Sequence, residues 1–197
     1  MLGRPAVFLD RDGTVTEEIG YVNHPERLRL LPRSGAAIRM LTEAGLDCVL
    51  VTNQAGVARG YFTEEVLTAT HARLETMLAA EGAELAAIYY CPHHPREGVP
   101  PWRADCDCRK PKPGMLLRAV KEHGYDLSRS WMVGDKISDV EFGQKLQARG
   151  VMVLTGYGRG ELEFQREAWK TAPDFIAGDL FDAARWIVKD NLARGAA

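Results

Sequence analysis

Two aspartates, Asp10 and Asp12, come directly after the apolar run of residues 6–9. If that run is a buried strand, both carboxylates face the loop at its end. Carboxylates this close repel each other, and a bound cation relieves the repulsion. Hard oxygen ligands suit Mg²⁺, and Gly13 allows a sharp turn that leaves backbone N–H groups open to an anion. The pattern indicates a magnesium site that handles an anionic group.

The same four residues, Asp10 to Gly13, have simpler interpretations. An Asp-x-Asp-Gly segment fits an ordinary acidic turn, and it also matches the start of an EF-hand calcium loop. An EF-hand needs an acidic side chain at its twelfth loop position, where this chain has Tyr21. The calcium loop is therefore rejected, whereas the acidic turn stays open for this segment taken alone.

Further polar groups stand at or near the ends of other apolar runs. A hydroxyl with two amides, a pair of cations, and a pair of acids with a cation are the groups that would hold a phosphoryl oxygen or a metal. Each alone is also typical of a turn, a solvated charge or a helix cap. The segments are Thr52-Asn53-Gln54, Arg109-Lys110 and Gly134-Asp135-Lys136-Ile137-Ser138-Asp139.

The elements that must position these groups alternate between strand and helix. Short apolar runs without alternation predict strands buried on both faces, at residues 6–9, 48–51, 86–90, 131–133, 151–154 and 175–177. Helical patterns lie between them, at residues 34–44, 63–81, 113–123, 140–149 and 181–193. This order predicts an α/β fold: a doubly wound parallel sheet with helices on both faces. Ligands bind beyond the carboxyl ends of such strands, where Asp10, Thr52 and Asp135 fall.

Capping residues mark several helix ends. Ser34 and Thr63 are the expected N-caps of their helices, and Pro113 suits the first position of the next one. Gly124 is expected to end that helix. Residues 157–166 are left open, as a loop over the site or as plain surface.

Length and composition favour one globular domain over residues 1–197. The chain is 46% hydrophobic and 26% charged, with a formal net charge of −2, so it does not have the basic surface of a nucleic-acid binder. No apolar run reaches the length of a membrane span, and the charges at residues 10–12 interrupt any signal-peptide core. We expect a cytoplasmic protein, in which cysteines are thiols or metal ligands.

Three of the four cysteines gather in one proline-rich loop with a histidine. Cys91, His93, Cys106 and Cys108 form a Cys₃His set, which suits a structural zinc ion, so a zinc-binding loop is predicted at about residues 91–108. His94 competes with His93 as the fourth ligand. The alternative is a set of buried thiols beside a surface histidine. Cys48 lies within a predicted strand and is expected in the core.

Taken together, these motifs resemble those of the haloacid dehalogenase superfamily over nearly the whole chain. The resemblance implies that Asp10 is a nucleophile and Asp12 a general acid/base. It assigns Thr52 and Lys110 to the phosphoryl group, with Lys112 as a weaker candidate for the lysine. It further implies a magnesium-dependent phosphatase whose ion is held at Asp10, Asp12 and Asp135, the Asp12 contact coming through the loop backbone.

The cysteine loop narrows the resemblance to the superfamily's phosphatases for heptose bisphosphate and for histidinol phosphate. The first group, which removes a 7-phosphate on the ADP-heptose route to lipopolysaccharide core, is favoured, because zinc-loop histidinol-phosphate phosphatases are commonly fused to a second enzyme. The resemblance implies that a set of side chains faces the substrate: Glu18, Ile19, Gly20, Tyr21, Thr52, Asn53, Gln54, Ala55, Arg109, Lys110 and Lys136.

Three other functions remain as alternatives. They are a histidinol-phosphate phosphatase, a nucleic-acid 3′-phosphatase, and a degenerate phosphate-binding module without activity. The net charge of −2 argues against the nucleic-acid enzyme. No insertion is long enough for a large cap domain, and the expected protein is a monomer that acts on a small sugar phosphate.

Overall fold

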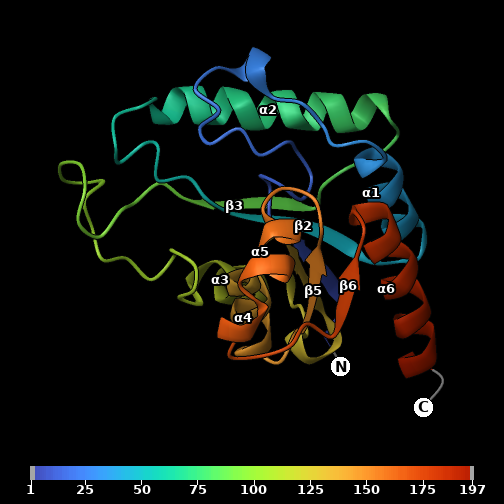
Figure 1. Ribbon diagram of the computed structural model, residues 1–197. Helices are drawn as coiled ribbons and strands as arrows, with labels where there is room; N and C mark the ends of the chain where they lie inside the picture. Colours follow the sequence, from blue (N-terminus) through green and yellow to red (C-terminus); the bar gives the residue numbers. More distant parts are fainter. Residues whose placement is uncertain (1–2, 196–197) are drawn as a thin grey trace.

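The computed structural model describes residues 3–195, which contain a six-stranded parallel sheet (Figure 1). The strands are β1 (Ala6–Leu9), β2 (Asp47–Asn53), β3 (Ala87–Cys91), β4 (Trp131–Gly134), β5 (Arg149–Val153) and β6 (Phe175–Ala177). Their order across the sheet is β3-β2-β1-β4-β5-β6, and every neighbouring pair is parallel. The chain winds outward from β1 in both directions, so the predicted doubly wound sheet is confirmed.

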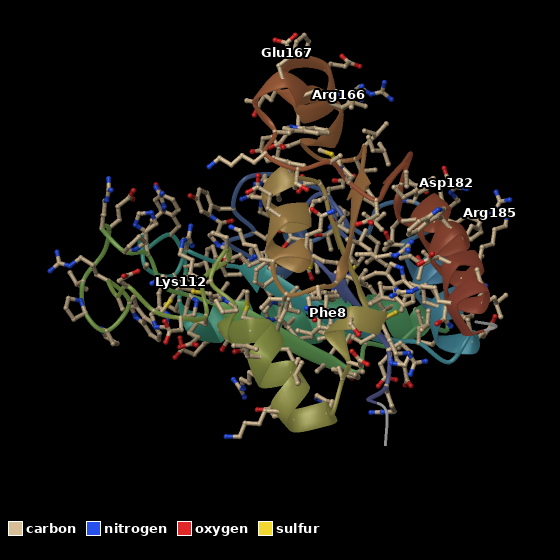
Figure 2. The ribbon with its side chains drawn as sticks, turned by 90° about the horizontal axis from the view of Figure 1, so that it is seen from below. Phe8, Lys112, Arg166, Glu167, Asp182 and Arg185 are labelled. Atoms are coloured by element: carbon tan, nitrogen blue, oxygen red, sulfur yellow. The ribbon has the colours of Figure 1, made fainter. Side chains whose placement is uncertain are left out.

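Helices cover both faces of this sheet (Figure 1). They are α1 (Ser34–Glu43), α2 (Glu64–Ala80), α3 (Gly114–His123), α4 (Ile137–Gln144), α5 (Gly158–Phe164) and α6 (Leu180–Gly195). Val7 and Leu9 of β1 pack into the core beneath α1, α2 and α6. Ala6 and Phe8 pack into the opposite core, beneath α3 and α4 (Figure 2). Because both faces are buried, the strand is apolar at every position rather than at alternate ones.

The helix ends agree only partly with the capping residues expected from sequence. Thr63 caps α2 by accepting a backbone N–H three residues on, and Gly124 ends α3 in the left-handed conformation, with φ of 72°. The prediction for Ser34 is wrong: it is the first residue of α1, and Arg33 is the cap, with φ of 67°. Pro113 stands one position earlier than expected, at the cap itself.

Two other elements differ from expectation near the site. The helix predicted over residues 140–149 runs from Ile137 to Gln144 instead, and a turn with Gln147 at φ of 69° leads into β5. This shift places Asp139 in the first turn of α4. The segment at residues 157–166, left open as loop or surface, contains α5, which lies across the carboxyl edge of the sheet (Figure 1).

Two long connections complete the wall around the carboxyl edge. Residues 10–33 follow β1 and residues 92–113 follow β3. Among the described residues, these two connections hold only a short 3-10 turn and isolated bridges, and they form no separate cap domain. In residues 3–195 no helix is both long and apolar enough to cross a membrane.

Candidate active site

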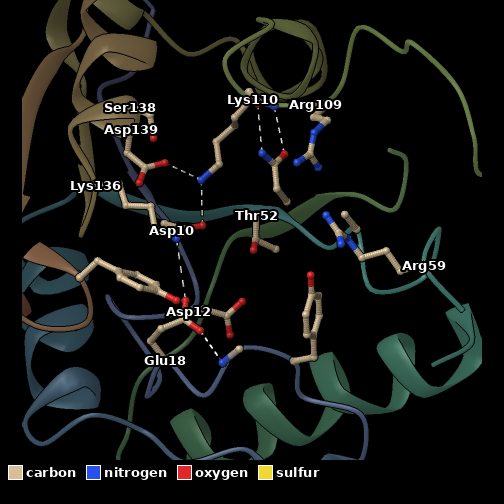
Figure 3. Close-up of a pocket in the computed structure, with 15 residues that line it drawn as sticks. Asp10, Asp12, Glu18, Thr52, Arg59, Arg109, Lys110, Lys136, Ser138 and Asp139 are labelled. Carbon is tan, nitrogen blue, oxygen red and sulfur yellow. Dashed lines mark hydrogen bonds and ion pairs between the residues drawn. The ribbon is translucent and has the colours of Figure 1, made fainter. Parts of the chain in front are cut away.

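Asp10 lies at the carboxyl end of β1, where its backbone N–H donates to the carbonyl of Val133 in β4 at 2.9 Å. Its carboxylate accepts a hydrogen bond from Nζ of Lys110 at 2.8 Å, and the same Nζ donates to Asp139 at 2.7 Å (Figure 3). All three side chains are nearly buried. Burial alone lowers the pKa of Lys110, but the charges of Asp10 and Asp139 outweigh it and hold that pKa above its usual range. Lys110 is therefore a fixed cation between two acids.

Asn53, at the end of β2, fixes the position of this lysine. Its amide donates to the Lys110 carbonyl at 3.1 Å and accepts from the Lys110 N–H at 3.0 Å. The loop after β3 is thereby held against β2. Of the two lysines that the motif offered, Lys110 reaches Asp10. Lys112 lies on the surface and pairs with Asp105 at 2.6 Å (Figure 2).

The carboxylates of Asp10, Asp135 and Asp139 form a cluster whose oxygens lie within 4.8 Å of one another. Oδ2 of Asp135 accepts the N–H of Tyr157 at 2.8 Å, whereas its buried Oδ1 has no partner. Burial, and after it the charge of Asp10, raises the pKa of Asp135 to about 7. A divalent cation among these oxygens would satisfy the unpartnered Oδ1 and offset the repulsion, and oxygen donors of this kind suit Mg²⁺. The residues present therefore fit a magnesium ion.

Glycines let two loops close on this cluster. A Cβ at Gly13 or at Gly156 would collide with the Asp135 carboxylate, and both residues have positive φ. The closeness of the Asp135 carboxylate and the positive φ of the predicted turn thus both require a glycine at position 13. The loops after β1 and β5 meet around one acid.

Asp12 lies outside the carboxylate cluster. Its two oxygens accept hydrogen bonds from Nε and Nη2 of Arg11, each at 3.0 Å. Gln54 donates to Asp12 at 2.8 Å and to the Thr52 hydroxyl at 2.9 Å. Hydrogen bonds from Arg11 and Gln54 therefore hold the side chain of Asp12, and its oxygens do not belong to the cluster that would surround a metal.

A cavity of about 330 Å³ is lined by Asp10, Asp12, Lys110 and Asp139 among these groups (Figure 3). Most of the residues expected to face a substrate line it: Glu18, Gly20, Tyr21, Thr52, Asn53, Ala55, Arg109, Lys110 and Lys136. Two do not. Ile19 borders a neighbouring hollow, and Gln54 is buried behind the wall, in contact with Asp12.

Four lining residues were not predicted as site residues: Arg59, Ser138, Asp139 and Tyr157. Tyr157 precedes α5, and its ring centroid lies 4.3 Å from Nζ of Lys136, which is also 3.9 Å from Glu18. Burial raises the pKa of Glu18, while the N–H of Gly20 opposes that shift. No role was predicted for Arg59, whereas Tyr157 lies in the segment at residues 157–166 that was left open as a loop over the site or as surface.

The predicted zinc ligands converge in space. Sγ of Cys106 lies 3.4 Å from Sγ of Cys91 and 3.2 Å from Sγ of Cys108, and Nδ1 of His93 lies 3.4 Å from Sγ of Cys108. Bonds of about 2.0–2.3 Å to a tetrahedral zinc would put its ligand atoms about 3.3–3.8 Å apart. The four residues therefore fit zinc.

His94 and Cys48 have other surroundings. Nδ1 of His94 accepts backbone N–H groups of Arg96 and Glu97, so His93 is the histidine of the cluster. Cys48 is fully buried in β2, as predicted. Next to the cluster, Nη1 of Arg109 donates to the His93 carbonyl at 3.2 Å, so the cysteine loop sets where this cavity-lining arginine points.

Known proteins are similar to this chain in sequence and in fold. The sequence profile of the HAD-hydrolase-like family matches residues 107–183. The chain is 44% identical to the D-glycero-D-manno-heptose-1,7-bisphosphate 7-phosphatase of Thermosynechococcus vestitus over 93% of this chain and 95% of that protein. It is 47% identical to the D-glycero-beta-D-manno-heptose-1,7-bisphosphate 7-phosphatase of Yersinia pestis, again over 93% and 95%.

A solved structure agrees with these relatives. The D,D-heptose 1,7-bisphosphate phosphatase from B. bronchiseptica, complexed with magnesium and phosphate, superimposes with a TM-score of 0.82 at 33% identity. The match covers 94% of this chain and 99% of that one. The identity to the curated relatives extends over nearly the full length of both partners, and the fold and the superfamily motifs agree with it. The chain therefore belongs to the heptose-1,7-bisphosphate 7-phosphatase family of the haloacid dehalogenase superfamily.

Proposed function

We propose that this chain is a phosphatase that removes the 7-phosphate of D-glycero-D-manno-heptose 1,7-bisphosphate, on the ADP-heptose route to lipopolysaccharide core. One observation carries the proposal. Asp10, paired with Lys110, shares a small polar cavity with Arg109, and the position of Arg109 depends on the Cys/His cluster. A reactive carboxylate and fixed cations in about 330 Å³ suit a small substrate with more than one phosphate.

The first chemical step belongs to Asp10. A carboxylate oxygen attacks phosphorus, the bond from phosphorus to the sugar oxygen breaks, and an aspartyl-phosphate forms. Lys110 and the Thr52 hydroxyl hold the oxygens of the transferring group. Because Lys110 is already fixed between two acids, little reorganisation is needed as charge moves onto the phosphoryl oxygens.

Asp12 transfers the protons. Its carboxylic acid protonates the leaving alkoxide in the first step. Its carboxylate then takes a proton from the water that attacks the aspartyl-phosphate, which releases phosphate and restores Asp10. The hydrogen bonds from Arg11 and Gln54 support this role, because they fix the carboxylate beside Thr52.

Magnesium dependence is part of the proposal. The ion would be held by the carboxylates of Asp10 and Asp135, next to Asp139, and by the loop backbone at Asp12. It would lower the repulsion between an anionic nucleophile and the phosphate. We expect EDTA to reduce kcat by more than about 100-fold, since such an ion supplies several kcal/mol of stabilisation. Added Mg²⁺ should restore activity. Full activity in EDTA-treated, magnesium-free protein would contradict this.

Zinc is proposed as the second ion, in a structural role. Four protein ligands fill a tetrahedral site and leave no open position for water. In Cys106→Ser we expect loss of stoichiometric zinc by elemental analysis. KM should rise by about tenfold, because a misplaced Arg109 loses a charge-assisted contact worth about 1.5 kcal/mol, and kcat should change less. Zinc-free wild-type protein with normal KM would refute the assignment.

The substrate itself is tested by a comparison of kcat/KM. We expect heptose 1,7-bisphosphate to be hydrolysed at least about 100-fold more efficiently than histidinol phosphate or a 3′-phosphorylated oligonucleotide, because a site that pairs a second phosphate rejects substrates without it. A preference for histidinol phosphate would transfer the assignment to that alternative. No turnover of any substrate, with phosphate still bound, would indicate a binding module.

Three broader expectations remain part of the proposal. Residues 1–197 act as one phosphatase domain, with the zinc-binding loop at about residues 91–108. The protein acts as a monomer on a small sugar phosphate rather than on nucleic acid or membrane. Its place of action is the cytoplasm.

A further inference from the structure

Arg11 is a charged side chain that is only 1% exposed. It stands between the two catalytic aspartates in sequence, but its guanidinium does not line the cavity. Two of its nitrogens hold Asp12, and Nη2 also donates to the Gln54 side-chain oxygen at 2.9 Å. A buried cation costs free energy unless it is paired and hydrogen-bonded, so this arrangement has a role beyond packing.

His71 supplies the remaining partner of Arg11. It lies on the buried face of α2, and its Nε2 is 3.3 Å from Nη1 of Arg11. Because arginine nitrogens only donate, Nε2 must accept. Burial, and after it the charge of Arg11, lowers the pKa of His71 to about 3, so the ring stays neutral and keeps this acceptor. A helix on one face of the sheet is thereby connected to the catalytic loop.

Gln54 joins the same network to the phosphoryl site. Its side-chain oxygen accepts from Arg11, and its amide nitrogen donates to Asp12 and to Thr52. Because Arg11 donates to the side-chain oxygen of Gln54, the amide nitrogen of Gln54 must point toward Asp12 and Thr52. The orientation of Asp12 is thus linked to that of the hydroxyl that receives the phosphoryl group.

We propose that Arg11, held in place by hydrogen bonds to His71 and Gln54, is a positioning residue that orients the Asp12 carboxyl toward the leaving group. His71 touches neither the cavity nor Asp12 and acts only through Arg11. The inference rests on the proposed function, in which Asp12 is the general acid. It predicts that loss of the His71 acceptor lets the guanidinium turn, so that Asp12 loses its direction while Asp10 and Lys110 keep theirs.

The test compares two leaving groups in His71→Leu. An alkyl phosphate such as the sugar substrate needs a proton on its leaving oxygen, whereas 4-nitrophenyl phosphate releases a stabilised phenolate that needs none. The ratio kcat/KM reports the step up to transfer of phosphorus to Asp10. A well-placed general acid contributes about 10²–10⁴-fold, and we expect partial misplacement to lower kcat/KM for the alkyl phosphate by about tenfold or more. For 4-nitrophenyl phosphate the change should stay within about threefold.

Two variants separate positioning from stability. Thr70→Val, next along α2, removes a buried hydroxyl that donates to the Val66 carbonyl at 2.8 Å, and it should leave the ratio of kcat/KM between the two substrates unchanged. His71→Gln restores a carbonyl acceptor for Arg11 and should recover most of the alkyl-phosphate activity. If His71→Leu does not fold, the same comparison is made in His71→Gln and Gln54→Met. The inference is supported if kcat/KM for the alkyl phosphate, relative to 4-nitrophenyl phosphate, stays near wild type in His71→Gln and falls in Gln54→Met. An unchanged ratio in Gln54→Met overturns it.

The outcomes distinguish this inference from the proposed function. Asp12→Asn should lose activity selectively on the alkyl phosphate. If Asp12→Asn shows this selectivity but His71→Leu lowers kcat/KM equally for both substrates, His71 and Arg11 have only a structural role and the inference is overturned. If Asp12→Asn itself shows no selectivity, the general-acid assignment fails and the inference fails with it. Selective loss in both variants supports both.

Discussion

Asp10→Asn is expected to abolish turnover, with kcat/KM lowered by about 10⁴-fold or more, as when the nucleophile of a covalent mechanism is removed. Asparagine has nearly the same shape and still accepts the hydrogen bond that Nζ of Lys110 donates at 2.8 Å, so the cavity keeps its form. A neutral amide does not attack phosphorus. The loss should therefore be chemical rather than structural.

The stability of this variant provides the control. Asp10 and Asp139 share Lys110 as partner and lie in one cluster with Asp135, and replacing one of these carboxylates by a neutral amide removes like-charge repulsion. We expect a melting temperature in EDTA equal to that of wild type or higher. Stopped turnovers of wild-type enzyme should also yield a phosphoenzyme that Asp10→Asn does not form. Activity within tenfold of wild type would remove Asp10 from the nucleophile role.

The position of Asp10 could be predicted because it depends on local rules. A continuous apolar run is typical of a strand buried on both faces, and the acid that follows it must lie at the carboxyl edge. The same reasoning located Thr52 and Asp135. The cysteine loop was also predictable, because Cys91 and His93 are two residues apart, as are Cys106 and Cys108, and only closure of the loop was needed to bring the pairs together.

The sequence placed Asp139 among the acids that could hold a metal and left Tyr157 in a segment open as loop or surface, but it assigned neither residue a role, because their roles depend on contacts distant in sequence. Asp139 meets Lys110 from the first turn of α4, and that helix was predicted to begin three residues too late. Tyr157 precedes α5, a helix of seven residues that is too short to give a clear periodic pattern. Gln54 was expected to face the substrate but does not line the cavity, for a related reason. Its neighbours face the cavity, but Arg11 draws its side chain inward, and no sequence rule specifies that contact.

Lys110→Met is expected to have the largest effect on stability. In wild type the ammonium lies between Asp10 and Asp139 at 2.8 and 2.7 Å, with 8% of its side chain exposed. Removing one member of a buried ionic group leaves the others uncompensated and costs about 3–5 kcal/mol. We expect that loss in urea unfolding of the metal-free protein. Saturating Mg²⁺ should recover part of it, because the ion would neutralise the same carboxylates.

Activity should fall along with stability, and a neighbouring lysine gives the matched control. Loss of a preorganised cation at the transferring group lowers kcat by about 10²–10³-fold, measured with saturating Mg²⁺ at a temperature where the variant is folded. Lys112→Met makes the same change two residues along the loop, where the pair with Asp105 is exposed and contributes at most about 1 kcal/mol. It should keep near-normal kcat and stability. Equal effects of the two substitutions would mean that Lys110 acts only through the general charge of the loop, and its assignment to the phosphoryl group would be withdrawn.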